Sequence, residues 1–187
     1  MKFGQLHVRT AFPATGGFDE QEPLFCLHPG ERTGRLFQRF IASMAKRRSV
    51  YAPDMPGCGE SDPGPEGSGP GIGAAVVLDL AADLRLRRVD LLGAGDGAGV
   101  ALDIAIAAPE LVRRIVLVGA FALDRLASVS QGCLVLATGS TSIEMRRRAG
   151  DLRANIEFVA APEYSDDPFT LAADVLAERV ATFLDRS

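Results

Sequence analysis

The residues whose types and spacing could do chemistry lie at positions 93–99, which read GAGDGAG. They stand between an apolar run, VDLL at 89–92, and a helix-like run that begins at Val100. A turn of small residues between a strand and a helix leaves backbone N–H groups at the helix N-terminus available to bind anionic oxygens. Three interpretations are open: a turn that presents a nucleophile, a turn that binds phosphate, and a remnant of either.

Two carboxylates are candidates for acid–base chemistry, Asp96 inside this turn and Asp166 in EYSDDPF. Two carboxylates in one partly apolar cleft can have their pKa values pushed apart, which provides an acid and a base for proton transfer, elimination, decarboxylation or cyclisation. Structural roles are the alternative. Asp96 would then be a carboxylate in the first turn of a helix, and Asp166 or Asp167 would cap a helix.

The composition argues against several classes of function, namely nucleic-acid binding, metal or cofactor binding, and membrane insertion. The net charge of −4 argues against nucleic-acid binding, and we interpret the short clusters KRR (46–48) and RRR (146–148) as solvated helix ends. Three cysteines without CxxC spacing and two histidines, His7 and His28, offer no metal-ligand pattern, so no metal or other cofactor is predicted. No apolar run approaches the roughly 20 residues of a membrane span.

The elements that must position these groups alternate along the chain. Short apolar β-type runs are followed by longer helical patterns, which is typical of βαβ units on a parallel sheet. Several of the strands are apolar throughout, as expected when helices cover both faces. A final helix is expected over 169–185, with Val175 on its apolar stripe. We predict a single α/β domain over residues 1–187.

Several segments, in the right order, resemble the α/β-hydrolase superfamily over nearly the whole chain. PLFCLHPGERTGRLFQRF is similar to a strand, a His-containing oxyanion loop and a first helix, and LFCLHPG is also similar to thioesterases of polyketide and nonribosomal peptide assembly. VYAPDMPGCGESD and VDLLGAGDGAGVALDIAIAAPELVRRIVLVGA resemble the next strand and then the elbow strand, elbow, helix and following strand. The resemblance implies a three-layer fold with a mostly parallel sheet, and the short FALDRLASVSQG implies no cap domain.

The resemblance also implies a Ser-His-Asp triad, from which this sequence departs. The family's G-x-S-x-G elbow corresponds to residues 93–97, so the nucleophile position is Gly95. The region of the catalytic Asp reads TGSTS, and the best match for the catalytic His is Asp166. Because no His follows residue 28, we predict that serine-hydrolase chemistry does not operate.

The backbone apparatus of the family is nevertheless expected. The resemblance places the N–H of the residue after the nucleophile position in an oxyanion hole, together with a loop after the first strand. We therefore expect ligand-binding roles for His28, Gly30, Glu31, Gly95 and Asp96.

Two function classes remain. The first is a non-hydrolytic lyase, isomerase or cyclase that acts on an acyl or polyketide-like small molecule with Asp96 and Asp166 as catalytic groups. The second is a catalytically silent relative that binds a small ligand or a protein partner. A dinucleotide-binding oxidoreductase fits less well, because GAGDGA matches G-x-G-x-x-G/A but the next strand, ending VLVGA, lacks the acidic residue that binds ribose. We expect a cytoplasmic protein without membrane binding, and an uncapped pocket favours a homodimer.

Overall fold

A seven-stranded sheet forms the centre of the molecule, with the strand order β1-β3-β2-β4-β5-β6-β7. The computed structural model describes residues 4–14, 21–64, 71–119, 121–149 and 153–186. The strands are Val8–Ala11 (β1), Gln21–Leu27 (β2), Arg48–Pro53 (β3), Val89–Ala94 (β4), Val112–Val118 (β5), Gly132–Thr138 (β6) and Ile156–Ala161 (β7). Only β1 and β3 pair antiparallel among the described strands, so the mostly parallel sheet is confirmed.

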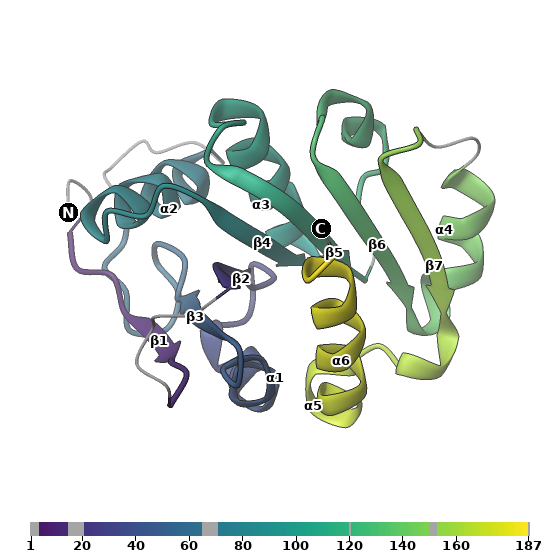
Figure 1. Ribbon diagram of the computed structural model, residues 1–187, viewed down its shortest axis with the longest axis horizontal. Helices are drawn as coiled ribbons and strands as arrows, with labels where there is room; N and C mark the ends of the chain where they lie inside the picture. Colours follow the sequence, from purple (N-terminus) through teal and green to yellow (C-terminus); the bar gives the residue numbers. More distant parts are fainter. Residues whose placement is uncertain (1–3, 15–20, 65–70, 120, 150–152, 187) are drawn as a thin grey trace.

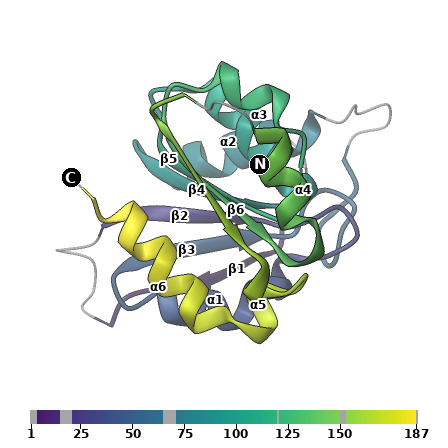
Figure 2. The same ribbon diagram turned by 90° about the vertical axis from the view of Figure 1, so that its right-hand side faces the viewer.

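Helices cover both faces of this sheet, as Figures 1 and 2 show. On one face lie α2 (Ile72–Asp83), α3 (Asp96–Ala107) and α4 (Ser142–Ala149), and on the other lie α1 (Gln38–Met44), α5 (Pro168–Leu171) and α6 (Ala173–Leu184). Short 3-10 helices are Gly34–Phe37 (η1), Asp124–Ser128 (η2), Gly139–Thr141 (η3) and Pro162–Tyr164 (η4). Between β5 and β6 the described chain contains only η2, so the expected capless form is confirmed.

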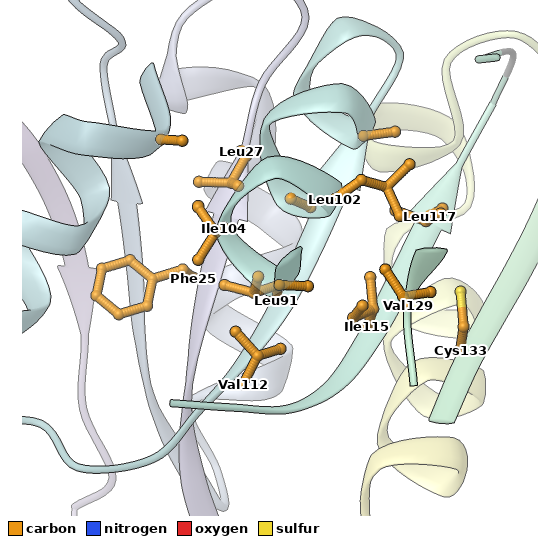
Figure 3. Close-up of a cluster of buried hydrophobic side chains, with 14 of the residues drawn as sticks. Phe25, Leu27, Leu91, Leu102, Ile104, Val112, Ile115, Leu117, Val129 and Cys133 are labelled. Carbon is orange, nitrogen blue, oxygen red and sulfur yellow. The ribbon is translucent and has the colours of Figure 1, made fainter. Parts of the chain in front are cut away.

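The core has two apolar layers because the central strands are buried on both faces. Figure 3 shows the layer under α2 and α3, where Phe25, Leu91, Ile104 and Ile115 are fully buried in one apolar cluster. The opposite layer joins the other sides of the same strands to α1 and α6. Each β4 residue is buried, which is the physical reason that this strand, apart from Asp90, consists of small or apolar residues.

The final helix differs from its prediction. The chain leaves helical geometry at Ala172, where φ is −131° and ψ is 26°, so the segment forms α5 and α6 instead of one helix. Val175 is 55% exposed, and its expected place on the buried stripe is wrong. The stripe of α6 includes Leu176 and Val180, and Val175 lies outside it, about 100° of helical rotation from Leu176.

A cluster of charged residues lies at the amino ends of the strands. Asp90 is fully buried, and its carboxylate accepts hydrogen bonds from Arg48 Nη1 at 2.8 Å and from Arg113 Nη2 at 2.6 Å. Arg113 also donates to the Leu184 carbonyl at 2.7 Å, and Arg48 pairs with Asp185. These contacts fasten the end of α6 to β3, β4 and β5. The prediction that Arg48 belongs to a solvated helix end is therefore wrong.

Candidate functional site

The GAGDGAG segment forms a tight turn from β4 into α3. Gly95 stands between the two elements with φ 52° and ψ −121°, a backbone conformation that L side chains rarely adopt. Its N–H donates to the Val118 carbonyl at 3.1 Å, and its own carbonyl accepts from the Ala98 N–H at 3.0 Å. The small residues predicted for an elbow are thus required by its backbone path.

A cavity of about 300 Å³ opens beside Gly95, at the carboxyl ends of β4, β5 and β6. Its lining residues are Pro29, Arg32, Leu36, Ala94, Gly95, Val118, Gly119, Thr138, Asp166, Asp167, Pro168 and Phe169. The carboxyl ends of parallel strands are where open α/β sheets bind ligands. Because Gly95 has no side chain, the turn presents only backbone to this cavity at that residue.

Asp96 lies just outside that lining. Its side chain is exposed, and Oδ2 accepts a hydrogen bond from the Gly30 N–H at 3.4 Å. The carboxylate thereby links the elbow to the loop after β2, and it covers one of the backbone donors expected to bind ligand. A catalytic role for Asp96 stays a prediction.

Asp166 lines the cavity and also holds the turn after β6. Its Oδ1 accepts from the Ser140 N–H at 2.9 Å and from Ser140 Oγ at 3.2 Å. The sequence analysis places Asp96 and Asp166 in one cleft. In the structure Asp166 lines the cavity, whereas Asp96 lies outside its lining. The catalytic role of Asp166 stays a prediction.

Asp167 also lines the cavity, which the sequence analysis did not predict. It stands at the N-cap position of α5, as the helix-entry pattern DDP predicts, but its side chain makes no capping hydrogen bond. The side chain is half-buried, and its carboxylate has no hydrogen-bond or ion-pair partner among the described residues. A carboxylate at a cap position normally bonds to the helix N–H groups, so only the structure shows that this one is available.

His28 positions the loop after β2. The ring is buried, Nδ1 donates to the Pro29 carbonyl at 2.7 Å, and Nε2 accepts from the Met55 N–H at 2.8 Å. Burial lowers the pKa of His28, which favours this neutral form. With both nitrogens bonded to backbone, neither is available to a ligand. Glu31 is exposed and lines a separate shallow pocket with Thr33 and Arg35.

The turn after β3 is organised around Asp54. This buried carboxylate accepts from the Gly34 N–H at 2.7 Å, the Glu60 N–H at 3.2 Å and Arg9 Nη1 at 2.7 Å. Burial by itself raises the pKa of Asp54, but these hydrogen bonds outweigh it, and the pKa lies below its ordinary value. The side chain is therefore an ion that fastens η1 and β1 to the turn.

The cysteine in this turn is not an activated nucleophile. Cys58 Sγ donates to the Gly30 carbonyl at 3.4 Å, and burial together with the charge of Asp54 raises the pKa of the thiol. Since the thiolate is the reactive form, a raised pKa makes the group inert near neutral pH. Within the part of the chain that the structure describes, no group of three or more His, Cys, Asp and Glu is arranged to hold a metal ion.

Comparison with known proteins agrees with this geometry. The sequence profile described as "Alpha/beta hydrolase family" matches residues 24–187. The chain belongs to the alpha/beta hydrolase family. No curated protein sequence is significantly similar to it.

Solved structures of the alpha/beta hydrolase family superpose on almost the whole chain. Naproxen esterase (carboxylesterase NP) from Bacillus subtilis has a TM-score of 0.83 at 16% identity, covering 99% of this chain and 89% of its own. A hydrolase from Pseudomonas aeruginosa PA01 has a TM-score of 0.79 at 16% identity, covering 97% of this chain and 94% of its own. The alpha/beta hydrolase MGS-M2 from a Medee basin deep-sea metagenome library has a TM-score of 0.81 at 13% identity, covering 97% of this chain and 94% of its own. At these identities the likeness shows the fold alone.

No helix among the described residues is both long and apolar enough to cross a membrane.

Proposed function

We propose that this alpha/beta hydrolase family member binds a small, partly apolar molecule in the cavity beside Gly95 and performs no covalent hydrolysis. One observation carries the proposal. Gly95 has the strained backbone conformation of an elbow and opens into a cavity of about 300 Å³, yet it has no side chain that could attack a carbonyl. A cavity beside a residue without a nucleophilic side chain supports binding without covalent chemistry.

The surroundings of the cavity support binding over hydrolysis. Leu36, Val118 and Phe169 give it apolar walls, as small-molecule sites require. Serine hydrolysis also needs a base beside the nucleophile. The cavity lining contains no histidine among the described residues, and His28 has both ring nitrogens bonded to backbone.

A second candidate is a non-hydrolytic lyase, isomerase or cyclase. It is favoured by the carboxylates of Asp166 and Asp167, which line the same cavity and could supply a proton acceptor. Asp96, outside the lining, would then act from the elbow. An enzyme of this kind loses turnover in Asp166→Asn or Asp96→Asn while remaining folded, whereas a binding protein has no turnover to lose.

The first measurement is native mass spectrometry of the protein purified from its own host. The proposal expects a co-purifying small molecule, and the same spectrum tests the expected homodimer. Leu36→Trp, which fills the cavity, should remove the bound mass, whereas Ile106→Trp at an exposed position of α3 should keep it. Turnover of p-nitrophenyl esters that Leu36→Trp abolishes and Ile106→Trp keeps would contradict the proposal.

A further inference from the structure

We propose that the cavity beside Gly95 selects ligands that carry an ammonium group and rejects carboxylates. In this proposal Asp167 receives the ammonium group and Asp96 turns anions away. The inference rests on the proposed function, because it names the ligand class of the same cavity. The proposed ligand class differs from the acyl ligand expected from the sequence. Carbonyl or carboxylate oxygens of an acyl ligand would need free N–H donors at the elbow.

Asp167 supplies the attraction. Asp167 lines the cavity next to Pro168 and Phe169, its side chain is half-buried, and its carboxylate has no partner among the described residues. A carboxylate that has lost part of its hydration without gaining a hydrogen bond is costly, and a charged N–H donor restores that loss. An ammonium group inside the cavity would make this charge-assisted bond.

Asp166 adds negative charge to the same wall without competing for the ligand. Its Oδ1 accepts hydrogen bonds from the N–H and Oγ of Ser140, and these bonds fix the carboxylate in place. Two adjacent aspartates therefore line one small cavity, and the negative charge of both favours a cation.

Asp96 supplies the rejection. The Gly30 N–H, one of the donors from which an anion site could be built, donates to Asp96 Oδ2 instead. A ligand carboxylate that approached this donor would have to displace a like charge. Asp96 thus places a negative charge at the Gly30 N–H, where an external anion would otherwise bind.

Arg32 is the one cation among the lining residues, and its position limits its influence. It is exposed and also lines the shallow pocket on the outer side of the loop. It forms no ion pair with Asp166 or Asp167. As an exposed group, Arg32 is screened by water, and it leaves the half-buried Asp167 without a counter-charge.

The cavity size sets the scale of a test ligand. At roughly 30 Å³ per water-sized group, 300 Å³ holds about ten non-hydrogen atoms. Three compounds of this size share one aromatic body: 2-phenylethylamine, 2-phenylethanol and phenylacetate. Dissociation constants for each at pH 7 come from two-dimensional NMR titrations of the ¹⁵N-labelled protein, followed at the Gly95 and Val118 amides. We expect the amine to bind at least tenfold more tightly than the alcohol, and phenylacetate to bind most weakly.

Single-charge variants test the assigned residues. Asp167→Asn should bring the amine-to-alcohol affinity ratio close to one. Glu110→Gln removes one exposed carboxylate beyond the far end of α3 and should keep the wild-type ratio, which controls for overall charge. Asp96→Asn should raise the affinity for phenylacetate at least threefold.

The outcomes separate the two proposals. If 2-phenylethanol binds at the elbow as tightly as the amine, or phenylacetate binds most tightly, the charge selection is wrong while the proposed function stands. If none of the three compounds shifts the Gly95 and Val118 amides at millimolar concentration, the binding function is overturned and the selection with it. Retention of the amine preference in Asp167→Asn would show that this residue does not receive the ammonium group.

Discussion

The backbone of Gly97 lies against the carbonyl oxygen of Leu27 so closely that a Cβ atom on residue 97 would approach this oxygen to less than 3.0 Å. This contact joins the first turn of α3 to the carboxyl end of β2. It brings the elbow beside the loop that contains His28 and Gly30, and so it shapes one wall of the cavity.

Substitution of this glycine should therefore be costly. Gly97→Ala forces a methyl group into the Leu27 carbonyl, and we expect the free energy of unfolding to fall by about 2 kcal/mol or more, as for overpacked cores. Gly99→Ala in the same helix meets open space and should be neutral or stabilising by up to about 1 kcal/mol. Urea denaturation of both variants measures the difference, and equal effects would show that the close approach does not matter.

Restoring a serine at the elbow should not restore hydrolysis. Gly95→Ser adds a hydroxyl at the nucleophile position, but no histidine base faces it among the cavity residues. We expect no release of p-nitrophenol from short-chain esters above the wild-type level. The positive φ of 52° should also lower the stability by about 1 to 3 kcal/mol. Gly57→Ser, at φ +76° in open space, controls for that backbone cost, and a burst of p-nitrophenol from Gly95→Ser alone would refute the prediction.

The buried charge cluster should be far more sensitive than exposed pairs. Asp90→Asn keeps the side-chain volume but removes the fully buried carboxylate that Arg48 and Arg113 share, and we expect a loss of about 3 kcal/mol or more. Glu144→Gln breaks an exposed pair with Arg147 and should cost less than about 1 kcal/mol. Chemical denaturation at pH 7 compares the two, and similar small losses would mean that Asp90 is dispensable.

The stability contributed by Asp54 should depend on pH. Its pKa in the folded protein is below the ordinary 3.8, so the ion stabilises the fold fully above that value and the contribution is lost as pH falls through the folded pKa. Asp54→Asn should cost about 2 kcal/mol at pH 7, since hydrogen bonds to a charged group are lost. The difference between wild type and variant should shrink at pH 3, and a difference that stays constant from pH 7 to pH 3 would contradict this assignment.

Much of the fold is predictable because its signals are local. The run VDLL becomes β4, and GAGDGAG becomes the elbow and the start of α3, because a buried parallel strand and a tight turn impose their own residue types. The break at Ala172 was missed because the apolar spacing of residues 169–184 fits one continuous helix about as well as two. Which spacing is used depends on how α5 and α6 pack on α1, and that is a tertiary contact.

The sequence by itself determined that residue 95 is glycine and that no histidine follows residue 28, since these are matters of residue identity. Only the tertiary structure decided what the remaining polar groups do. Asp96 bonds to Gly30, 66 residues away in the chain, and Asp166 bonds to Ser140, 26 residues away, whereas Asp167 is left free beside the cavity. Neighbouring aspartates in the same DDP motif have the same local propensity. Their different roles arise from contacts between segments that are distant in sequence, which no local pattern contains.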